Sequence, residues 1–284
     1  MKVWISGACG YVGAALVPRL LAARHKVVAF DTQFFGNGYL PDNGSLTVVK
    51  GDILDVRSVQ ASLAGCEVVV HLAGLTSDKS CQLHPALSQQ INVHGLKLVS
   101  ALTKNIYRRI FLSSAAIFGG ETTYVKAKKE CEEFLSGSYW TILRPGSVCG
   151  YSPRMRFDLP VNQMTRDAML KGEITVNGGK QKRTNLHIND LCDTINALFV
   201  SKGGTYNVNS ENLTILETAR KVAAKTGASI HILDYTDGRS YEMQSDLTTT
   251  RTVDEAIRDM IARFKDGYWK DVFTNPGYMN VYGG

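Results

Sequence analysis

The amino-acid sequence predicts an α/β protein, a doubly wound parallel sheet of the Rossmann type with a smaller C-terminal lobe. Three observations lead to this fold class. The chain opens with a short apolar strand, residues 2–6, that runs directly into a glycine-rich turn at 7–13. Apolar strands then alternate with helical segments as far as residue 146, a pattern typical of parallel sheets covered on both faces. Beyond residue 146 the alternation stops.

The elements follow in chain order. Strands are expected at 2–6, 26–30, 46–49, 67–74, 109–114 and 140–145, with helices between them at 14–21, 56–63, 85–104 and 124–135. Later elements are helices at 159–171, 214–226 and 253–264, a helix that ends near 200 and a strand at 205–208. Right-handed crossovers make such a sheet doubly wound. We therefore divide the chain into a first domain at 1–146 and a substrate-binding lobe at 147–284, from which 189–208 is expected to return to the main sheet.

The opening turn has the features of a dinucleotide phosphate site. Gly7 permits a tight turn, Gly10 lets backbone N–H groups approach phosphates, and Gly13 lets the following helix pack closely on the strand. Asp31 ends the second strand, where a carboxylate can accept the ribose hydroxyls of adenosine. No basic residue stands beside Asp31 to hold a 2′-phosphate, so the sequence favours NAD over NADP.

Other strand ends supply further candidate cofactor contacts, since ligands of such sheets bind beyond the carboxyl ends of the strands. Asp52 and Ile53 could hold the adenine amino group and ring face. Ala73 and Gly74 leave room for the backbone of the cofactor.

A YxxxK element supplies candidate catalytic groups. Tyr124 and Lys128 are four residues apart on a predicted helix and share one face. A free phenol titrates near pH 10, but a nearby ammonium and a positively charged nicotinamide both favour the phenolate. Tyr124 can then act as general acid/base while hydride moves to or from the nicotinamide. The YxxxK pattern alone occurs often by chance, usually as a surface tyrosine with a solvated lysine. The catalytic interpretation becomes much stronger because the preceding strand ends in Ser114, whose hydroxyl can donate to the reacting oxygen.

Taken together, these motifs resemble the extended short-chain dehydrogenase/reductases, and among them the NAD-dependent sugar-nucleotide epimerase/dehydratase family. The resemblance is carried by residues 6–13, 51–53, 71–74, 91–93, 112–119, 124–128, 143–146, 183–190 and 239–241. It implies that Tyr124 is the catalytic base, that Lys128 binds the nicotinamide ribose and that Ser114 polarises the substrate. The cofactor-binding residues predicted in this way are Gly7, Cys9, Gly10, Tyr11, Val12, Gly13, Asp31, Asp52, Ile53, Leu72, Ala73, Gly74, Asn92, Lys128 and Pro145.

The resemblance also implies a site for a nucleotide-diphosphate sugar. Arg183 and Arg239 would hold the diphosphate, with Asn162 near the same group; Ser114 and Tyr124 would also contact the sugar. Arginine forks suit phosphate oxygens, although surface arginines in solvent are an equally good explanation from the residues alone. Asn92, in an apolar helical setting, can be a core amide bonded to backbone, and the resemblance suggests that this bond shapes the active site.

Two departures from the family pattern narrow the expected reaction. Dehydratases of the family place an Asp-Glu pair directly after the Ser/Thr, where this chain has Ala115 and Ala116. Removing water from a sugar needs an acid and a base, so dehydration is disfavoured. The loop at 115–123 is also shorter than usual. We expect an NAD-dependent epimerase that acts through a transient keto-sugar; an NAD(P)H-dependent reductase of nucleotide-4-keto-sugars and a non-catalytic NAD-binding scaffold stay open.

Composition excludes several other classes. The 284 residues are 44% hydrophobic and 20% charged, as in globular proteins, and no apolar run reaches the roughly 20 residues that span a bilayer. Six cysteines without a CxxC pair read as reduced thiols, and no metal site is expected. The net charge of +6 is dispersed, which argues against nucleic-acid binding. Without a signal peptide we expect a cytoplasmic protein, and a homodimer formed by the helices at 85–104 and 124–135.

Overall fold

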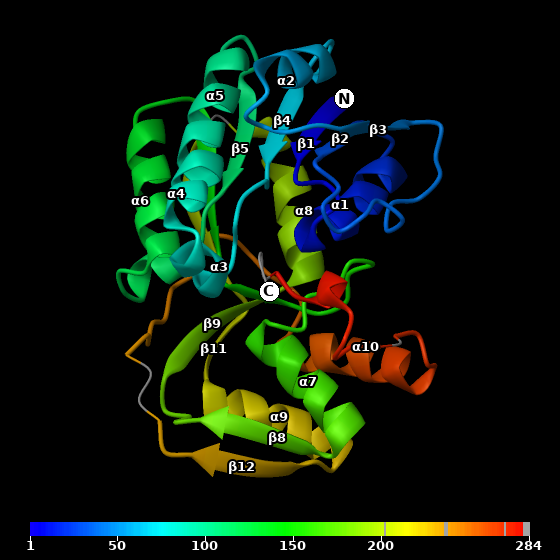
Figure 1. Ribbon diagram of the computed structural model, residues 1–284, viewed down its shortest axis with the longest axis vertical. Coiled ribbons are helices and arrows are strands. Elements are labelled where there is room, and N and C mark those ends of the chain that lie inside the picture. The colour runs from blue at the N-terminus through cyan, green and yellow to red at the C-terminus, as the bar shows by residue number, and fades with distance from the viewer. Residues whose placement is uncertain (202, 236–237, 270, 281–284) are drawn as a thin grey trace.

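The computed structural model describes residues 1–201, 203–235, 238–269 and 271–280 (Figure 1). Its main sheet has the strand order β10-β6-β5-β4-β1-β2-β3 within these residues, and every neighbouring pair is parallel. The strands are β1 (Lys2–Ser6), β2 (Lys26–Asp31), β3 (Leu46–Lys50), β4 (Val68–His71), β5 (Arg108–Leu112), β6 (Trp140–Pro145) and β10 (Gly204–Val208). The predicted fold class is confirmed. The strand order reverses between β1 and β4, which is where doubly wound sheets bind ligands.

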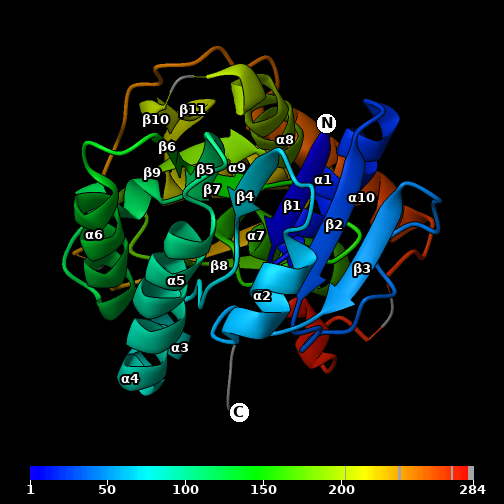
Figure 2. The ribbon, with the colours of Figure 1, turned by 90° about the horizontal axis from the view of Figure 1, so that it is seen from above.

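Helices cover both faces of this sheet, as Figure 2 shows from above. On one face lie α1 (Tyr11–Ala22) and α8 (Ile188–Ala197), and on the other lie α2 (Val56–Ser62), α5 (Gly95–Leu102) and α6 (Thr123–Leu135). Adjacent residues of one strand serve opposite cores, because side chains alternate along a strand: Ile5 joins the α1 side and Trp4 the α2 side, both fully buried. This explains why the central strands read as continuous apolar runs.

The helix expected at 85–104 is interrupted. α4 (Pro85–Ser88) continues into a π-helical turn at Gln89–His94 and then into α5. A separate short helix, α3 (Asp78–Leu83), precedes it and was not predicted. A π-turn widens the helix by one residue, and such turns occur often at functional sites. Here the turn carries the buried Asn92 toward the loop that follows β4.

The remaining elements form a second lobe beyond the carboxyl ends of the strands (Figure 1). Its helices are α7 (Pro160–Lys171), α9 (Ile215–Thr226) and α10 (Val253–Lys265), and its strands are β7 (Ser147–Cys149), β8 (Glu173–Asn177), β9 (Lys182–His187), β11 (Glu211–Thr214) and β12 (Ser229–Leu233). The strands make two small sheets, β11-β9-β7 and β12-β8. β10 leaves this lobe to pair with β6 of the main sheet. A functional division of the chain at residue 146 remains a prediction.

The last described residues, 276–280, return to the junction of the two lobes (Figure 1). There the N–H of Phe157 donates to the carbonyl of Tyr278 at 2.8 Å. No helix among the described residues is long and apolar enough to cross a membrane.

Candidate active site

The groove at the strand ends begins at the glycine turn between β1 and α1. Gly7 has φ +72°, and a Cβ atom there would lie 2.7 Å from the backbone nitrogen of Ala73 on β4's loop. A Cβ atom at Gly13 would lie 2.5 Å from the carbonyl oxygen of Ala8. Both positions therefore require glycine, one for the turn and one for the packing of the helix. The turn leads into the N-terminus of α1, where backbone N–H groups favour an anion.

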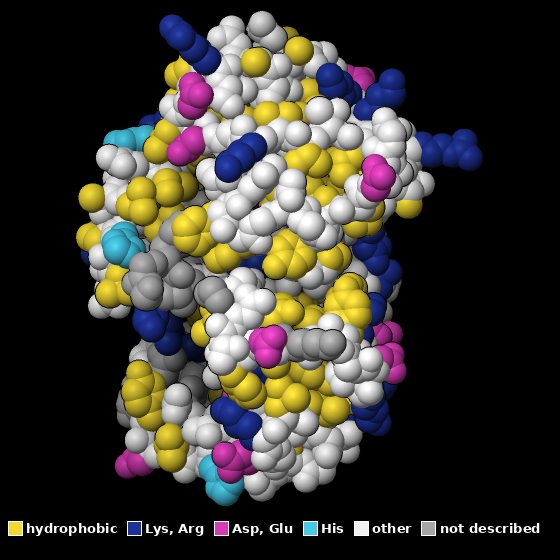
Figure 3. Space-filling model, turned by 45° about the vertical axis from the view of Figure 1, so that its right-hand side comes forward, with side chains coloured by type: hydrophobic (Ala, Val, Ile, Leu, Met, Phe, Trp, Pro, Cys, Tyr) yellow, Lys and Arg dark blue, Asp and Glu magenta, His cyan; other side chains and the backbone are white. Residues whose placement is uncertain are grey.

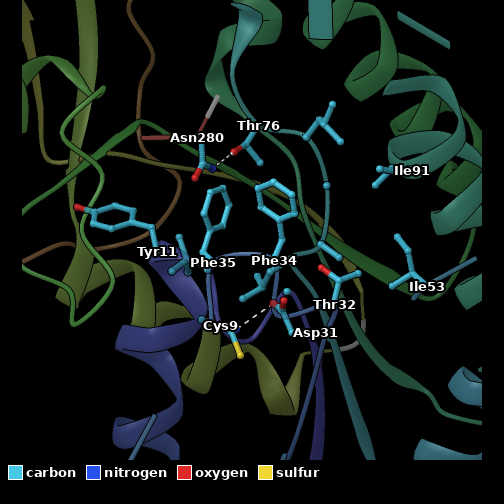
Figure 4. A pocket seen from close by; sticks show the side chains of 18 of the residues that line it. Cys9, Tyr11, Asp31, Thr32, Phe34, Phe35, Ile53, Thr76, Ile91 and Asn280 are labelled. Carbon is cyan, nitrogen blue, oxygen red and sulfur yellow. Dashed lines mark hydrogen bonds between the residues drawn. The ribbon is translucent and has the colours of Figure 1, made fainter. Parts of the chain in front are cut away.

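Most of the predicted cofactor residues come together in one pocket at this groove (Figure 4). Those that line it are Gly7, Cys9, Gly10, Tyr11, Val12, Gly13, Asp31, Asp52, Ile53, Leu72, Ala73 and Gly74. Asn92, Lys128 and Pro145 are not among its lining residues.

Asp31 is tied to the glycine turn by its carboxylate. Oδ2 accepts from the N–H of Cys9 at 3.0 Å, and Oδ1 accepts from the N–H of Gln33 at 2.7 Å. Burial raises the pKa of this carboxyl above its ordinary value, while the two backbone N–H groups and the charge of Arg154 act against that rise. Since a carboxylate offers about four lone-pair directions, acceptor capacity is left for a ligand.

The pocket has further lining residues that the sequence did not single out. Phe34 and Phe35, in the loop after β2, meet edge to face at 4.9 Å, and the guanidinium of Arg154 lies 4.0 Å from the ring centroid of Phe35. Figure 4 shows both rings reaching into the pocket. Thr76, Arg156 and Asn280 also line it. None of these residues stands in a motif, and the loop at 32–45 reads as polar and irregular, so no local signal marks them.

The structure brings the three predicted catalytic residues together. Tyr124 and Lys128 lie on one face of α6, with the Lys128 Nζ 5.8 Å from the centroid of the Tyr124 ring. The hydroxyl of Ser114 lies near the phenol of Tyr124 and lowers the pKa of that phenol. Lys128 is buried, and its ammonium donates to the carbonyl of Leu112 at 2.6 Å, so β5 and α6 are joined at the site.

The charges around Tyr124 decide what its phenol can do. Desolvation raises the pKa of Tyr124 above its ordinary value, and the hydroxyl of Ser114 and the charge of Arg156 oppose that rise. Desolvation also lowers the pKa of Lys128. In the ligand-free site the phenol therefore holds its proton at neutral pH, and a further positive charge is needed before it can act as a base. Arg156 is the cation that sequence reasoning missed here.

Asn92 is buried and fully engaged in the core. Its Oδ1 accepts from the N–H of Leu75 at 2.8 Å, and its Nδ2 donates to the carbonyl of Leu75 at 3.1 Å and to Ser88 Oγ at 3.2 Å. The amide thus fixes the loop after β4, and residues 74–76 of that loop line the cofactor pocket.

A second cleft lies between the lobes and contains both predicted arginines. It is lined among others by Asp78, Gly119, Thr122, Ser147, Gln163, Arg183, Arg239 and Tyr241. Arg183 donates to the carbonyls of Lys182, at 2.9 Å, and of Arg239. Arg239 Nη1 lies 2.8 Å from Asp78 Oδ2, and this ion pair joins the second lobe to α3.

The structure does not bring Asn162 to this cleft. Its side chain is fully buried, its Oδ1 accepts from the N–H of Gly150 at 3.0 Å, and its Nδ2 donates to Tyr11 Oη at 3.1 Å and to the carbonyl of Arg156 at 3.0 Å. All the hydrogen-bonding capacity of the amide except one lone pair is used. Asn162 connects the loop after β7 to α1, and the cleft wall is formed by its neighbour Gln163.

On the face drawn in Figure 3, Lys and Arg side chains are interspersed with Asp and Glu. The six cysteines are free thiols. Within the described residues, no group of three or more His, Cys, Asp or Glu side chains could hold a metal ion.

The fold and the site define a class: a Rossmann-type α/β protein with a dinucleotide-shaped groove and a Tyr-Lys-Ser cluster. The comparison with protein families adds a partial match. A model described as the NAD dependent epimerase/dehydratase family matches residues 3–139, which is just under half of the chain, so the first half of the chain is similar to that family.

Individual relatives are distant but extend over most of the chain. An uncharacterized UDP-glucose epimerase, YtcB, of Bacillus subtilis (strain 168) is 23% identical over 96% of this chain and 97% of its own. UDP-glucuronic acid decarboxylase 4 of Arabidopsis thaliana is 24% identical over 88% of this chain, which spans 63% of that relative. Among solved structures, UDP-glucuronic acid 4-epimerase from Bacillus cereus, in complex with UDP-glucuronic acid and NAD, has a TM-score of 0.80 at 21% identity, over 94% of this chain and 100% of that one. This likeness shows the shared fold.

Proposed function

We propose that the protein is an NAD-dependent nucleotide-sugar epimerase that acts through a transient keto-sugar. The observation that carries the proposal is the cluster of Tyr124, Ser114 and Lys128 at the strand ends that also bear the glycine groove. A phenol, a hydroxyl and an ammonium from β5's end and α6 meet there, and this set can move a proton on and off a sugar hydroxyl.

The glycine groove is suited to NAD. Backbone N–H groups at the start of α1 would hold the pyrophosphate, and Asp31 keeps acceptor capacity for the adenosine ribose. Its carboxylate would repel a 2′-phosphate, which favours NAD over NADP. Bound NAD supplies hydride transfer, and its positively charged ring adds the charge that the Tyr124 phenol needs to ionise.

The roles of the chain's own groups follow from their positions. Ser114 donates a hydrogen bond to the reacting oxygen of the sugar. Tyr124 would take the proton of the sugar hydroxyl as hydride passes to NAD from the carbon that bears this hydroxyl, and would return the proton when hydride comes back to the other face of that carbon. Lys128 and Arg156 stabilise the phenolate in between. The sugar thus ends with the same oxidation state and an inverted carbon.

The second cleft is suited to a nucleotide diphosphate. Arg183 and Arg239 present guanidinium groups, which match phosphate oxygens, and both line the cleft next to Tyr241. The neighbouring structures with UDP-glucuronic acid or UDP-glucose make a UDP-sugar the first substrate to test. Ala115 and Ala116 supply neither an acid nor a base, which speaks against dehydration.

We also propose a homodimer formed by α6 and by the helical stretch at 85–104, which consists of α4, the π-helical turn and α5; the two lie side by side on one face of the sheet (Figures 1 and 2). Phe134 on α6 is 45% exposed, which gives that face an apolar residue.

One assay separates epimerase from reductase. Purified protein is incubated with UDP-, GDP-, CDP- and dTDP-sugars and catalytic amounts of NAD, without NADH or NADPH, and the sugars are analysed by chromatography. The epimerase interconverts two sugars and consumes no reductant. A nucleotide-4-keto-sugar is offered in parallel, and its reduction only when NADH or NADPH is added, with no interconversion of the other sugars, would establish the reductase, which uses the same tyrosine as an acid only.

A further inference from the structure

The C-terminal tail, residues 276–280, lies across the junction of the two lobes close to the groove. Ser80 Oγ on α3 donates to the carbonyl of Asn280 at 2.8 Å. On the other lobe, Arg154 Nη2 donates to the carbonyl of Met279 at 3.4 Å, and the N–H of Phe157 donates to the carbonyl of Tyr278. The tail is therefore held by main-chain contacts to both lobes.

These contacts place the side chain of Asn280 in the wall of the cofactor pocket. Its Nδ2 donates to Thr76 Oγ1 at 2.7 Å, and Arg156 Nη1 donates to the same oxygen at 3.1 Å. Figure 4 shows Asn280 beside Thr76 and above Phe35, on the side of the pocket away from Ile53. Leu112, whose carbonyl accepts from the ammonium of Lys128 at 2.6 Å, lines the same pocket as Arg156 and Asn280, so this cluster shares the pocket that reaches the catalytic residues.

The amide oxygen of Asn280 is left without a donor. Oδ1 is buried, and no group in the described part of the chain hydrogen-bonds to it. A buried acceptor without a partner is uncommon and costly, and in a pocket wall the missing donor is most simply a group of the ligand. The neighbouring hydroxyl of Thr76 and the guanidinium of Arg156 hold the amide in place and leave this oxygen for that purpose.

We propose that Asn280 is a ligand-binding residue, delivered by the C-terminal tail, whose amide oxygen accepts a hydrogen bond from an N–H or O–H group at the catalytic end of the groove. The proposal rests on the proposed function, in which two groups of this chemistry come to this end: the carboxamide of the nicotinamide and the hydroxyls of the sugar.

The test compares three variants of the full chain. Asn280→Leu removes the amide at nearly constant size, Asn280→Asp keeps an acceptor oxygen, and Thr274→Ala alters an exposed residue of the same C-terminal segment as a control. The dissociation constant of NAD is measured by titration calorimetry, and KM and kcat are measured with the UDP-sugar that the wild type converts. Thermal unfolding shows that each variant folds; Asn280→Ser replaces the leucine variant if that one does not.

We expect Asn280→Leu to raise either the dissociation constant of NAD or the KM of the UDP-sugar about 3- to 10-fold, which corresponds to the loss of one hydrogen bond. Asn280→Asp and Thr274→Ala should stay near wild type in both constants. A change in the NAD constant assigns the donor to the nicotinamide, and a change in KM alone assigns it to the sugar. Both constants within twofold of wild type in the leucine variant would overturn the inference, and so would an equal loss in the leucine and aspartate variants. If wild-type protein neither binds NAD nor converts a UDP-sugar, the proposed function itself fails, which is a separate outcome.

Discussion

The groove and the cleft of this protein are built in opposite ways. The floor of the groove is formed by backbone and small residues at the ends of parallel strands, so its shape there follows from the sheet; Gly7, for example, lies against the backbone of Ala73. The cleft is lined by side chains from distant segments, among them two arginines and three aspartates, and Arg239 there is paired with Asp78. The groove should therefore be sensitive to sterics and the cleft to charge, with the catalytic cluster between them.

We expect the largest effect on activity from the phenol of Tyr124, which belongs to the catalytic cluster between the groove and the cleft. Tyr124→Phe removes the proton donor and acceptor, and we expect kcat to fall about 10²- to 10⁴-fold. NAD affinity and KM should change little, because Tyr124 lines neither the groove nor the cleft. Steady-state kinetics and calorimetry check this together. A variant that keeps most of its kcat would show that another group moves the proton.

A matched glycine pair tests the steric character of the groove. Gly7 and Gly172 have nearly the same φ, +72° and +71°, but only Gly7 is crowded; nothing lies within 4 Å of a Cβ atom at Gly172. Gly172→Ala should cost only about 1–2 kcal/mol of unfolding free energy, from the left-handed backbone. Gly7→Ala adds overpacking of about 1–3 kcal/mol and should also weaken NAD binding. If urea unfolding gave equal losses of unfolding free energy in the two variants, and Gly7→Ala left NAD affinity unchanged, the contact of Gly7 with Ala73 would be contradicted.

The pH dependence of kcat tests the charges around the phenol. Arg156 opposes the desolvation that raises the pKa of Tyr124. The rate of proton removal rises with pH through that pKa, so a higher pKa moves the acid limb of the profile to higher pH. Arg156→Met should move the limb up by about one pH unit, which corresponds to 1.36 kcal/mol. Asp158→Asn removes the carboxylate paired with Arg156 and should move the limb down; shifts of the same sign in both variants would count against this explanation.

The smallest expected effect is in the cleft. Asp78 competes with phosphate for Arg239, and their ion pair is largely exposed, with side chains 35% and 46% accessible. Asp78→Asn should lower KM for the nucleotide sugar by about twofold to fivefold, the range of a surface ion pair. Asp193→Asn, which removes an ion-pair partner of Arg19 outside both sites, is the control. An unchanged or raised KM in Asp78→Asn would mean that Arg239 does not bind the diphosphate.

The same contrast explains what the sequence could predict. Buried apolar runs and glycine spacing are local signals, and they predicted the central strands, most of the groove lining and the meeting of Ser114, Tyr124 and Lys128. The residues that were missed depend on contacts distant in sequence: Asn280 donates to Thr76, which lies 204 positions earlier in the chain. Phe34 and Phe35 lie in an irregular loop, which has no periodic apolar pattern from which their positions could be predicted.

The errors also have physical causes. The helix at 85–104 was predicted as continuous because a π-turn leaves the apolar pattern of a helix almost unchanged. The strands β8 and β12 were missed because they are short and half exposed, with too few apolar residues to stand out. Asn162 was predicted on the cleft, but its place is set by Gly150, Tyr11 and the carbonyl of Arg156, partners that no spacing reveals.

The most direct test of the central claim is a crystal structure of the protein with NAD. We expect the adenosine at Asp31 and Ile53, the pyrophosphate on the turn from Gly7 to Gly13, and the nicotinamide ring beside the hydroxyl of Tyr124. A dinucleotide bound elsewhere, or in the groove with its nicotinamide far from Tyr124, would contradict the account.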